Sequence, residues 1–160
     1  YGRTLNWEDY ATVGTIYLGL KNYKEALRYY NDSVYHKHAN PVVLNNRGFC
    51  LMQLGEFDLD FKDFDSAIHY HNTYSEAYLN RGMVKINMGY LEDGETDIRQ
   101  GLAINEKQAL AYLYLGQLYD KKQNFRVALE NYEKAKSMGL EHHGLDFYIA
   151  EARRALNYDL

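Results

Sequence analysis

The sequence predicts an all-α fold, a solenoid of antiparallel helix hairpins, and three observations lead to that prediction. The 160 residues include only 1 Pro, too few for many short strands joined by tight turns. Apolar residues recur at steps of three and four residues, as they do on one face of a helix. Gly14, Gly48, Gly82 and Gly116 follow one another at intervals of 34 residues. Self-similarity at such a period is typical of stacked helical repeats.

The period divides most of the chain into four frames, 7–40, 41–74, 75–108 and 109–142. Each frame holds two apolar-periodic runs joined by a short polar link, which predicts a helix hairpin. The first helices are expected at 7–20, 41–54, 75–88 and 109–121, and the second helices at 23–36, 57–70, 91–104 and 125–138. Small residues recur along the second helices, where two helices need to approach closely.

Two helix starts carry capping signals. Asn40 followed by Pro41 is typical of an N-cap and a first helical residue. Thr73 with Glu76 three residues later predicts a capping box at the start of the third hairpin.

The chain after residue 142 is too short for another hairpin, yet Leu145 and Ile149 continue an apolar helical stripe among charged residues. This pattern predicts a capping helix over 143–157, because stacked repeats leave an apolar face exposed at each end. We therefore expect residues 1–160 to form a single domain of eight paired helices and a ninth that covers one end.

Two of the frames resemble the tetratricopeptide repeat. The family spacing is followed by Tyr10, Gly14, Tyr17, Ala26 and Tyr30 in the first frame and by Tyr112, Gly116, Tyr119, Ala128 and Tyr132 in the fourth. The middle frames resemble a variant with Arg before the glycine, and the proline usual near the end of each unit is absent. The resemblance implies a right-handed superhelix. In the third frame both small places are Gly, so we expect 91–104 to be the least stable second helix.

Charge and composition exclude several partners. The net charge is −4, with 18 Lys and Arg against 22 Asp and Glu, so no nucleic-acid partner is expected. No apolar stretch is long enough to span a bilayer, so we expect no membrane insertion of this segment. The single Cys50 can form no internal disulfide, which is typical of a reducing compartment. A chain that begins at Tyr1 rather than Met is consistent with a piece of a longer protein, so localisation stays open, with the cytoplasm favoured.

No arrangement typical of catalysis or of a cofactor is found. Phosphate-binding Gly-rich loops and nucleophile elbows are absent from the sequence. The pairs His36 with His38 and His69 with His71 end neighbouring second helices. Interaction of His with the helix dipole explains them better than a metal site does. We expect no enzymatic activity, no cofactor and no metal.

Arg47 and Arg81 stand where the outer frames have an apolar residue, on the side that faces the hairpin interior. Asp63 and Asp97 each follow one of these Arg residues by sixteen positions. A partly buried guanidinium needs acceptors, so we expect an Arg–carboxylate pair inside each middle hairpin. A ligand-binding role for the two Arg residues is the alternative.

The first helices of a solenoid line its concave side, where one stripe of each helix is free to meet a partner. The expected groove residues are Asn45, Asn46, Phe49, Met52, Leu79, Asn80, Met83, Ile86, Leu110, Leu113, Tyr114 and Gln117, with Phe147 and Tyr148 on the capping helix. On the first helix the same stripe holds Ala11, Thr12, Thr15 and Leu18. Asn46 and Asn80 either hold a peptide backbone or bind polar groups of neighbouring helices.

Some tetratricopeptide domains hold the acidic tail of a chaperone with Lys, Arg and Asn on three consecutive first helices. Ala11, Thr15, Glu76 and Asn80 occupy four of those places here, so such a tail is not expected. We expect instead a non-catalytic protein–protein interaction module or scaffold whose groove receives an apolar peptide or helix. Two alternatives stay open: a structural or self-associating module that forms a homo-oligomer, and a docking arm of a larger enzyme.

Overall fold

The computed structural model describes residues 4–36 and 40–156, with the backbone alone for residues 57–60. Within these ranges the chain forms helices and no strand, which confirms the all-α prediction. The helices are α1 (Trp7–Gly19), α2 (Tyr23–His36), α3 (Pro41–Leu54), α4 (Phe57–Tyr70), α5 (Ser75–Asn87), α6 (Leu91–Ile104), α7 (Ala109–Lys121), α8 (Phe125–Ser137) and α9 (Leu145–Ala155). The bounds of α1 to α8 agree with the predicted ranges to within one residue.

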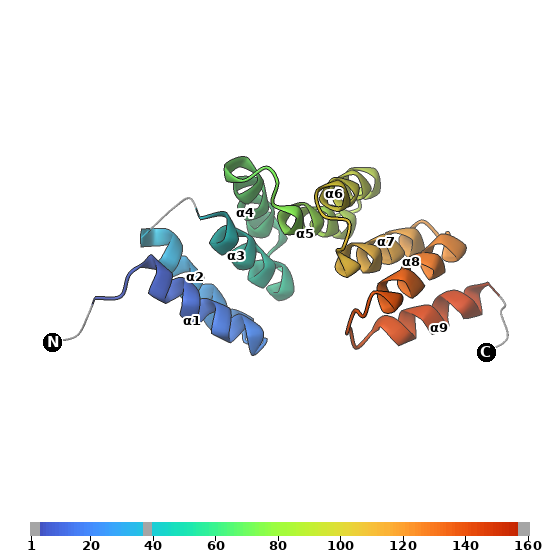
Figure 1. Ribbon diagram of the computed structural model, residues 1–160, viewed down its shortest axis with the longest axis horizontal. Coiled ribbons are helices and arrows are strands. Elements are labelled where there is room, and N and C mark those ends of the chain that lie inside the picture. The colour runs from blue at the N-terminus through green and yellow to red at the C-terminus, as the bar shows by residue number, and fades with distance from the viewer. Residues whose placement is uncertain (1–3, 37–39, 157–160) are drawn as a thin grey trace.

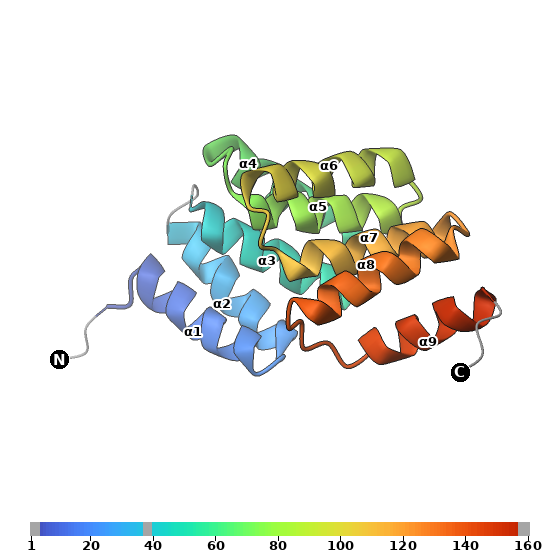
Figure 2. The ribbon, with the colours of Figure 1, turned by 45° about the vertical axis from the view of Figure 1, so that its right-hand side comes forward.

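Consecutive helices form antiparallel hairpins, and the hairpins stack into an arch (Figure 1). α1 pairs with α2, α3 with α4, α5 with α6, and α7 with α8, while α9 packs against α8. The arch runs from α1 through α4, α5 and α6 at its crest to α9, and the turned view shows the same order (Figure 2). The first helices α3, α5 and α7 also contact one another, so they form the inner layer of the arch.

Gly82 lies where the two helices of the third hairpin come closest. A Cβ added at Gly82 would lie 2.8 Å from the backbone oxygen of Gly94 and 2.8 Å from Cγ1 of Ile98. Gly14 and Gly116 instead lie against the ring of a Tyr on the second helix of their own hairpin. The glycine period therefore has a steric cause, because each of these glycines sits at a contact between the paired helices.

One predicted helix start is confirmed and another is wrong. Asn40 is the N-cap of α3, and its Oδ1 accepts a hydrogen bond of 3.0 Å from the N–H of the third helical residue. The capping box expected from Thr73 and Glu76 does not form, because Tyr74 is the N-cap of α5. Thr73 Oγ1 lies 3.1 Å from Nε2 of His71 instead. α5 begins at Ser75, as its predicted range indicated, and not at residue 74, where the capping pattern would have placed its start.

Both predicted Arg–carboxylate pairs are confirmed. Arg47 Nε and Nη2 donate to the two carboxylate oxygens of Asp63, each at 2.6 Å. Arg81 donates to Asp97 in the same way, at 2.8 and 2.7 Å. Arg81 Nη1 also donates at 2.6 Å to Asp65 on the preceding hairpin, a contact that the sequence did not reveal. The guanidinium groups are engaged inside the fold, which is the structural interpretation of these residues.

α9 covers the C-terminal end of the stack. Leu145, Ile149 and Ala152 are buried, and they belong to the same apolar cluster as the buried residues of α7 and α8. Each follows a buried residue of α7 by 34 positions, so α9 repeats the stacking face of a first helix. Arg153 and Arg154 on α9 are exposed. The helix begins two residues later than predicted, and residue 157 lies outside the described residues.

Candidate functional site

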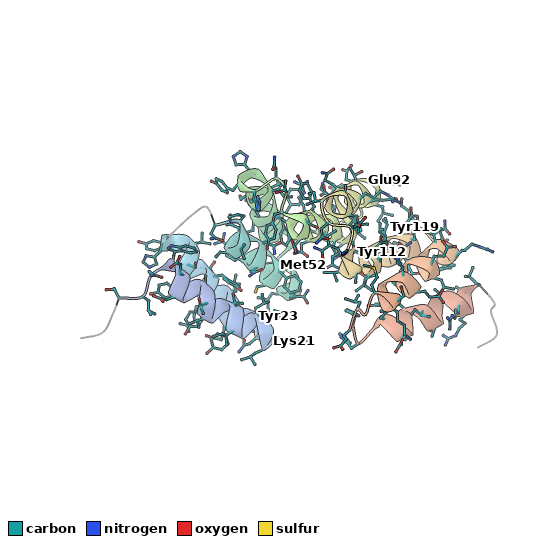
Figure 3. The ribbon with its side chains drawn as sticks, in the orientation of Figure 1. Lys21, Tyr23, Met52, Glu92, Tyr112 and Tyr119 are labelled. Atoms are coloured by element: carbon teal, nitrogen blue, oxygen red, sulfur yellow. The ribbon has the colours of Figure 1, made fainter. Side chains whose placement is uncertain are left out.

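The concave side of the arch carries a groove made of two adjoining cavities, which share Phe49 and Leu110. The larger cavity has a volume of about 480 Å³ and the smaller one about 140 Å³. Their walls come from α3, α5 and α7 and from the loops that precede α2 and α9. Lys21, Tyr23 and Met52 lie on this inner side of the arch (Figure 3). The two cavities together are called the groove below.

Most of the predicted residues line the groove, although several are more buried than expected. Leu79 and Leu113 are each 1% exposed and form its apolar floor. Phe49, Met83 and Leu110 are partly exposed and offer the accessible apolar surface. The full set of predicted residues in the lining is Asn45, Asn46, Phe49, Met52, Leu79, Asn80, Met83, Leu110, Leu113, Tyr114 and Gln117.

Three residues predicted for the groove lie elsewhere. Ile86 is 1% exposed, and its Cγ1 fills the hairpin interior, 2.6 Å from where a Cβ on Gly94 would sit. Tyr148 stacks on Tyr132 with ring centroids 5.4 Å apart, and Phe147 is 62% exposed outside the groove lining. α9 packs against α8 as an end cap, so its side chains do not continue the stripe of the inner helices.

α1 reaches the groove only through the loop that follows it. Ala11 and Leu18 pack against the core of the first hairpins. Thr12 and Thr15 donate hydrogen bonds to backbone carbonyls one turn earlier in their own helix. None of these four residues lines either cavity, so their contact with a partner stays a prediction.

Loops from opposite ends of the chain form one edge of the groove. Lys21 and Tyr23 come from the junction of α1 and α2, and Glu141, His142 and His143 come from the loop before α9. Sequence reasoning missed these residues because it looked for the site on the first helices alone. The curvature of the whole stack brings the two loops to one cavity, and no local motif signals it.

His142 is held neutral at this edge. Its Nδ1 accepts a hydrogen bond of 3.2 Å from the N–H of Gly144, so the ring proton resides on Nε2. Burial, together with the charges of His143 and Lys21, lowers the pKa of His142 below its ordinary value of 6.5. The His142 and His143 rings stack with centroids 4.9 Å apart.

The asparagines of the groove bind one another. Asn80 Nδ2 donates to Asn45 Oδ1 at 3.0 Å, and Asn45 Nδ2 donates to Asn46 Oδ1 at 3.4 Å. Asn45 and Asn80 are each 5% exposed. Asn80 thus binds a polar group of a neighbouring helix, whereas the bond of Asn46 lies within α3.

One polar atom on α7, in the side chain of Gln117, lacks a partner among the described residues. Gln117 Oε1 is buried and accepts no hydrogen bond from any described residue. Burial raises the pKa of Tyr114, which lies on the same helix. In the preceding repeats the place of Gln117 is held by Phe49 and Met83. Gln117 is thus a polar residue in an otherwise apolar part of the lining.

The described residues offer no alternative site of metal or thiolate chemistry. No three His, Cys, Asp or Glu side chains among them come close enough together to hold a metal ion. His36 stacks on Tyr10, and His38 lies outside the described residues. Burial raises the pKa of Cys50 to about 12, so it is a thiol at neutral pH. Among the described helices, none combines the length and apolar character needed to cross a bilayer.

Comparison with protein families agrees with this geometry. The family model described as Tetratricopeptide repeat matches residues 10–35, 75–108 and 109–138. These segments make up more than half of the sequence. The chain belongs to the tetratricopeptide repeat family. The second hairpin, 41–74, is outside the matched segments but has the same helix pair as the other three. Tetratricopeptide repeats generally mediate contacts between proteins, and proteins built from them are typically non-catalytic scaffolds.

Several solved tetratricopeptide structures share the fold. TTC0263 from Thermus thermophilus matches with a TM-score of 0.85 and 15% identity, over 95% of this chain and 84% of that one. PilF from Pseudomonas aeruginosa matches at 0.75 and 17%, over 96% and 70%. YrrB, described as having an unusual peptide-binding site, matches at 0.70 and 22%, over 92% and 74%. These likenesses confirm the predicted right-handed solenoid of helix hairpins.

Proposed function

We propose that the chain is a non-catalytic interaction module that binds an apolar segment of a partner protein in the groove. The observation that carries this proposal is the composition of the lining. Phe49, Met52, Met83 and Leu110 bring apolar side chains from three inner helices to one concave surface. Met side chains adapt to partners of different shape, and an aromatic ring supplies a large contact area.

The charges of the groove favour an apolar segment over an acidic one. Lys21 is the one Lys or Arg among the residues that line the two cavities, and Glu76 and Glu141 line them too. A strongly acidic tail would meet these carboxylates without a cluster of cations to offset them. Apolar contact is therefore the main source of affinity that the groove offers.

A matched pair of methionines tests the proposal. Short random peptides displayed on phage are selected on the unmodified protein, and the best peptide is measured by calorimetry on Met83→Glu and Met88→Glu. Met83 lines the groove, whereas Met88 is 44% exposed at the end of α5 and lies outside the lining. Because a buried charge opposes apolar contact, Met83→Glu is expected to weaken binding by about tenfold or more.

Met88→Glu is expected to bind the peptide as the unmodified protein does. Both variants keep their helicity, which circular dichroism verifies. Equal affinity in all three proteins would place the peptide site on the convex side or on the loops and would refute the proposal.

Self-association is the alternative function, and one observation favours it. Ile16 is 58% exposed on the outer face of α1, although its counterparts Cys50, Val84 and Leu118 in the later repeats are 0% exposed. Leu20, the residue that follows the last residue of α1, is 70% exposed. The preceding hairpin covers those counterparts, and a second copy of the chain packed on α1 would cover Ile16 in a similar way.

Sedimentation equilibrium over a range of concentrations separates the two functions. Self-association through α1 requires a mass that rises with concentration and returns to that of the monomer in Ile16→Asp. A monomer at all concentrations leaves the groove as the functional surface.

A further inference from the structure

The start of α9 is held by a residue that also forms one edge of the groove. Gly144 is the N-cap of α9 and has no side chain with which to cap it. The Nδ1 atom of His142 accepts a hydrogen bond of 3.2 Å from the N–H of Gly144. The carbonyl oxygen of His142 accepts one of 3.0 Å from the N–H of Leu145, the first helical residue. Because His142 also lines the larger cavity, one residue connects the start of α9 to the groove.

This arrangement requires a neutral imidazole ring at His142. A ring nitrogen accepts a hydrogen bond only when it carries no proton, whereas both ring nitrogens of a protonated His are donors. A second proton on the ring would therefore break the hydrogen bond to Gly144. It would also place a positive charge at the N-terminal end of α9, where the helix dipole disfavours a cation.

Two neighbouring cationic or titratable groups oppose the same charge. Lys21, on the loop before α2, lines the cavity together with His142. The ring of His143 stacks on that of His142 with centroids 4.9 Å apart. Burial and the charges of these two residues lower the pKa of His142. The helix start and the opposite edge of the groove thus favour the neutral ring together.

The acidic residues near His142 in the sequence do not compensate for these effects. Glu141 and Asp146 are both exposed, so water screens their charges. The carboxylate of Asp146 is bound to Lys136 of α8 at 2.7 Å. The other group of α9 that meets the His142 ring is the ring of Tyr148, with centroids 6.1 Å apart.

We propose that protonation of His142 releases residues 141–144 from the edge of the groove, so that the groove holds its partner at neutral pH and releases it in acid. This inference rests on the proposed function and adds a regulation to it. Leu140 packs against the apolar cluster of α7, α8 and α9, so the release is confined to the residues after it. A partner segment then loses the wall that Glu141, His142 and His143 supply.

The first test needs no partner. NMR of the unmodified protein, labelled with ¹⁵N, follows the backbone amide of Gly144 between pH 7.5 and pH 5. The heteronuclear NOE of this amide is expected to fall in acid, because a released loop moves on the ps–ns timescale. In His142→Asn the side-chain oxygen can accept the same hydrogen bond and takes up no proton in this range, so the NOE is expected to stay constant.

The second test measures binding of the selected peptide, prepared with blocked ends and without ionisable side chains. Calorimetry at pH 7.5 and pH 5 is expected to show about tenfold weaker binding in acid, since a ring that must be neutral in the complex takes up a proton in the free protein. His142→Asn is expected to bind equally well at both pH values. His143→Asn is the matched control, because it removes the neighbouring, exposed imidazole, and it is expected to keep the loss in acid.

Two results overturn the inference. One is a Gly144 NOE that is the same at both pH values, and the other is a loss of affinity in acid that is as large in His142→Asn as in the unmodified protein. Circular dichroism at both pH values verifies that every variant is folded. If Met83→Glu weakens binding at pH 7.5 while acid does not, the groove stands as the site and only the switch is wrong. Unchanged affinity in Met83→Glu would instead refute the proposed function, whatever the Gly144 amide does.

Discussion

At the scale of single residues, the glycine period marks contacts that tolerate no side chain. Gly82→Ala places a Cβ 2.8 Å from a backbone oxygen, which cannot move without shifting a helix. We expect this substitution to destabilise the protein by about 1–3 kcal/mol, although Ala favours a helix over Gly by about 1 kcal/mol. Gly19 meets no atom within 4 Å, so Gly19→Ala is expected to be neutral or stabilising. Similar unfolding midpoints in urea for the two variants would contradict this explanation.

The Arg47–Asp63 pair is a second residue-scale test. The Asp63 side chain is 7% exposed, so removing its partner leaves a buried carboxylate without compensation. Arg47→Leu is expected to cost about 2–4 kcal/mol, and Arg47→Leu with Asp63→Asn is expected to cost less than that single change. The double variant installs the residues that Leu115 and Asn131 supply in the fourth repeat. A double-mutant cycle on unfolding free energies measures the coupling, and additive effects would count against the pairing.

At the scale of elements, the junction between α6 and α7 depends on one partly buried acid, Glu95. Glu95 accepts hydrogen bonds from Lys122 and Tyr119, each at 2.8 Å, and from Arg99 at 2.7 Å. Burial alone would raise the pKa of Glu95, but the hydrogen bonds from these three residues lower it to about 2. Tyr119 and Glu92, a further acceptor of Lys122, are marked in Figure 3.

Because the folded pKa of Glu95 lies below its ordinary value of 4.5, its contribution to stability is complete above pH 4.5 and disappears as the pH falls toward 2. The contribution is on the order of 2 kcal/mol. Thermal melts of the unmodified protein and of Glu95→Gln should therefore differ at pH 6 and converge at low pH. A difference in Tm that persists undiminished near pH 2 would refute this role.

α6 shows why two positions with low helix propensity hold Gly. Gly94 and Gly101 suggested a weak helix, yet a Cβ on Gly94 would lie 2.6 Å from Ile86 and one on Gly101 would lie 2.6 Å from Leu79. The glycines are needed for close packing, and the low stability expected of this helix stays a prediction. At the start of α1, Asn6 and Asp9 form a capping box that was not predicted. An Asn followed three residues later by an acid is a sequence signal for such a cap.

At the scale of the whole molecule, the repeat period predicted the fold because the same packing of two helices recurs in every hairpin. The helix bounds, the Arg–carboxylate pairs and most of the groove stripe follow from residues at most one repeat apart. The edge of the groove, in contrast, depends on residues that lie several repeats apart in the sequence. Lys21 and His142 meet at one cavity through the accumulated rotation of all four hairpins. Gln117 was predicted for the groove, but only the structure shows that its Oε1 is buried without a hydrogen-bond partner among the described residues.

The meeting of Lys21 and His142 gives a prediction about the curvature of the whole arch. Because the pKa of His142 is lowered by burial and by the charges of His143 and Lys21, Lys21→Met is expected to raise it. The folded protein binds this proton less readily than the unfolded chain, so stability falls as the pH decreases below 6.5. Lys21→Met should therefore lose less stability than the unmodified protein as the pH decreases below 6.5.

Lys24→Met is the matched control, because it removes the same charge from an exposed place on α2 outside the groove. NMR titration of the His142 ring resonances measures the pKa in both variants and in the unmodified protein. A rise in Lys21→Met that is absent in Lys24→Met means that the two ends of the array face each other across the groove in solution. An equal rise of the His142 pKa in both variants would reflect net charge alone. An unchanged pKa in both variants would mean that the arch is more open, with the α1–α2 loop too far from His142 to affect its proton.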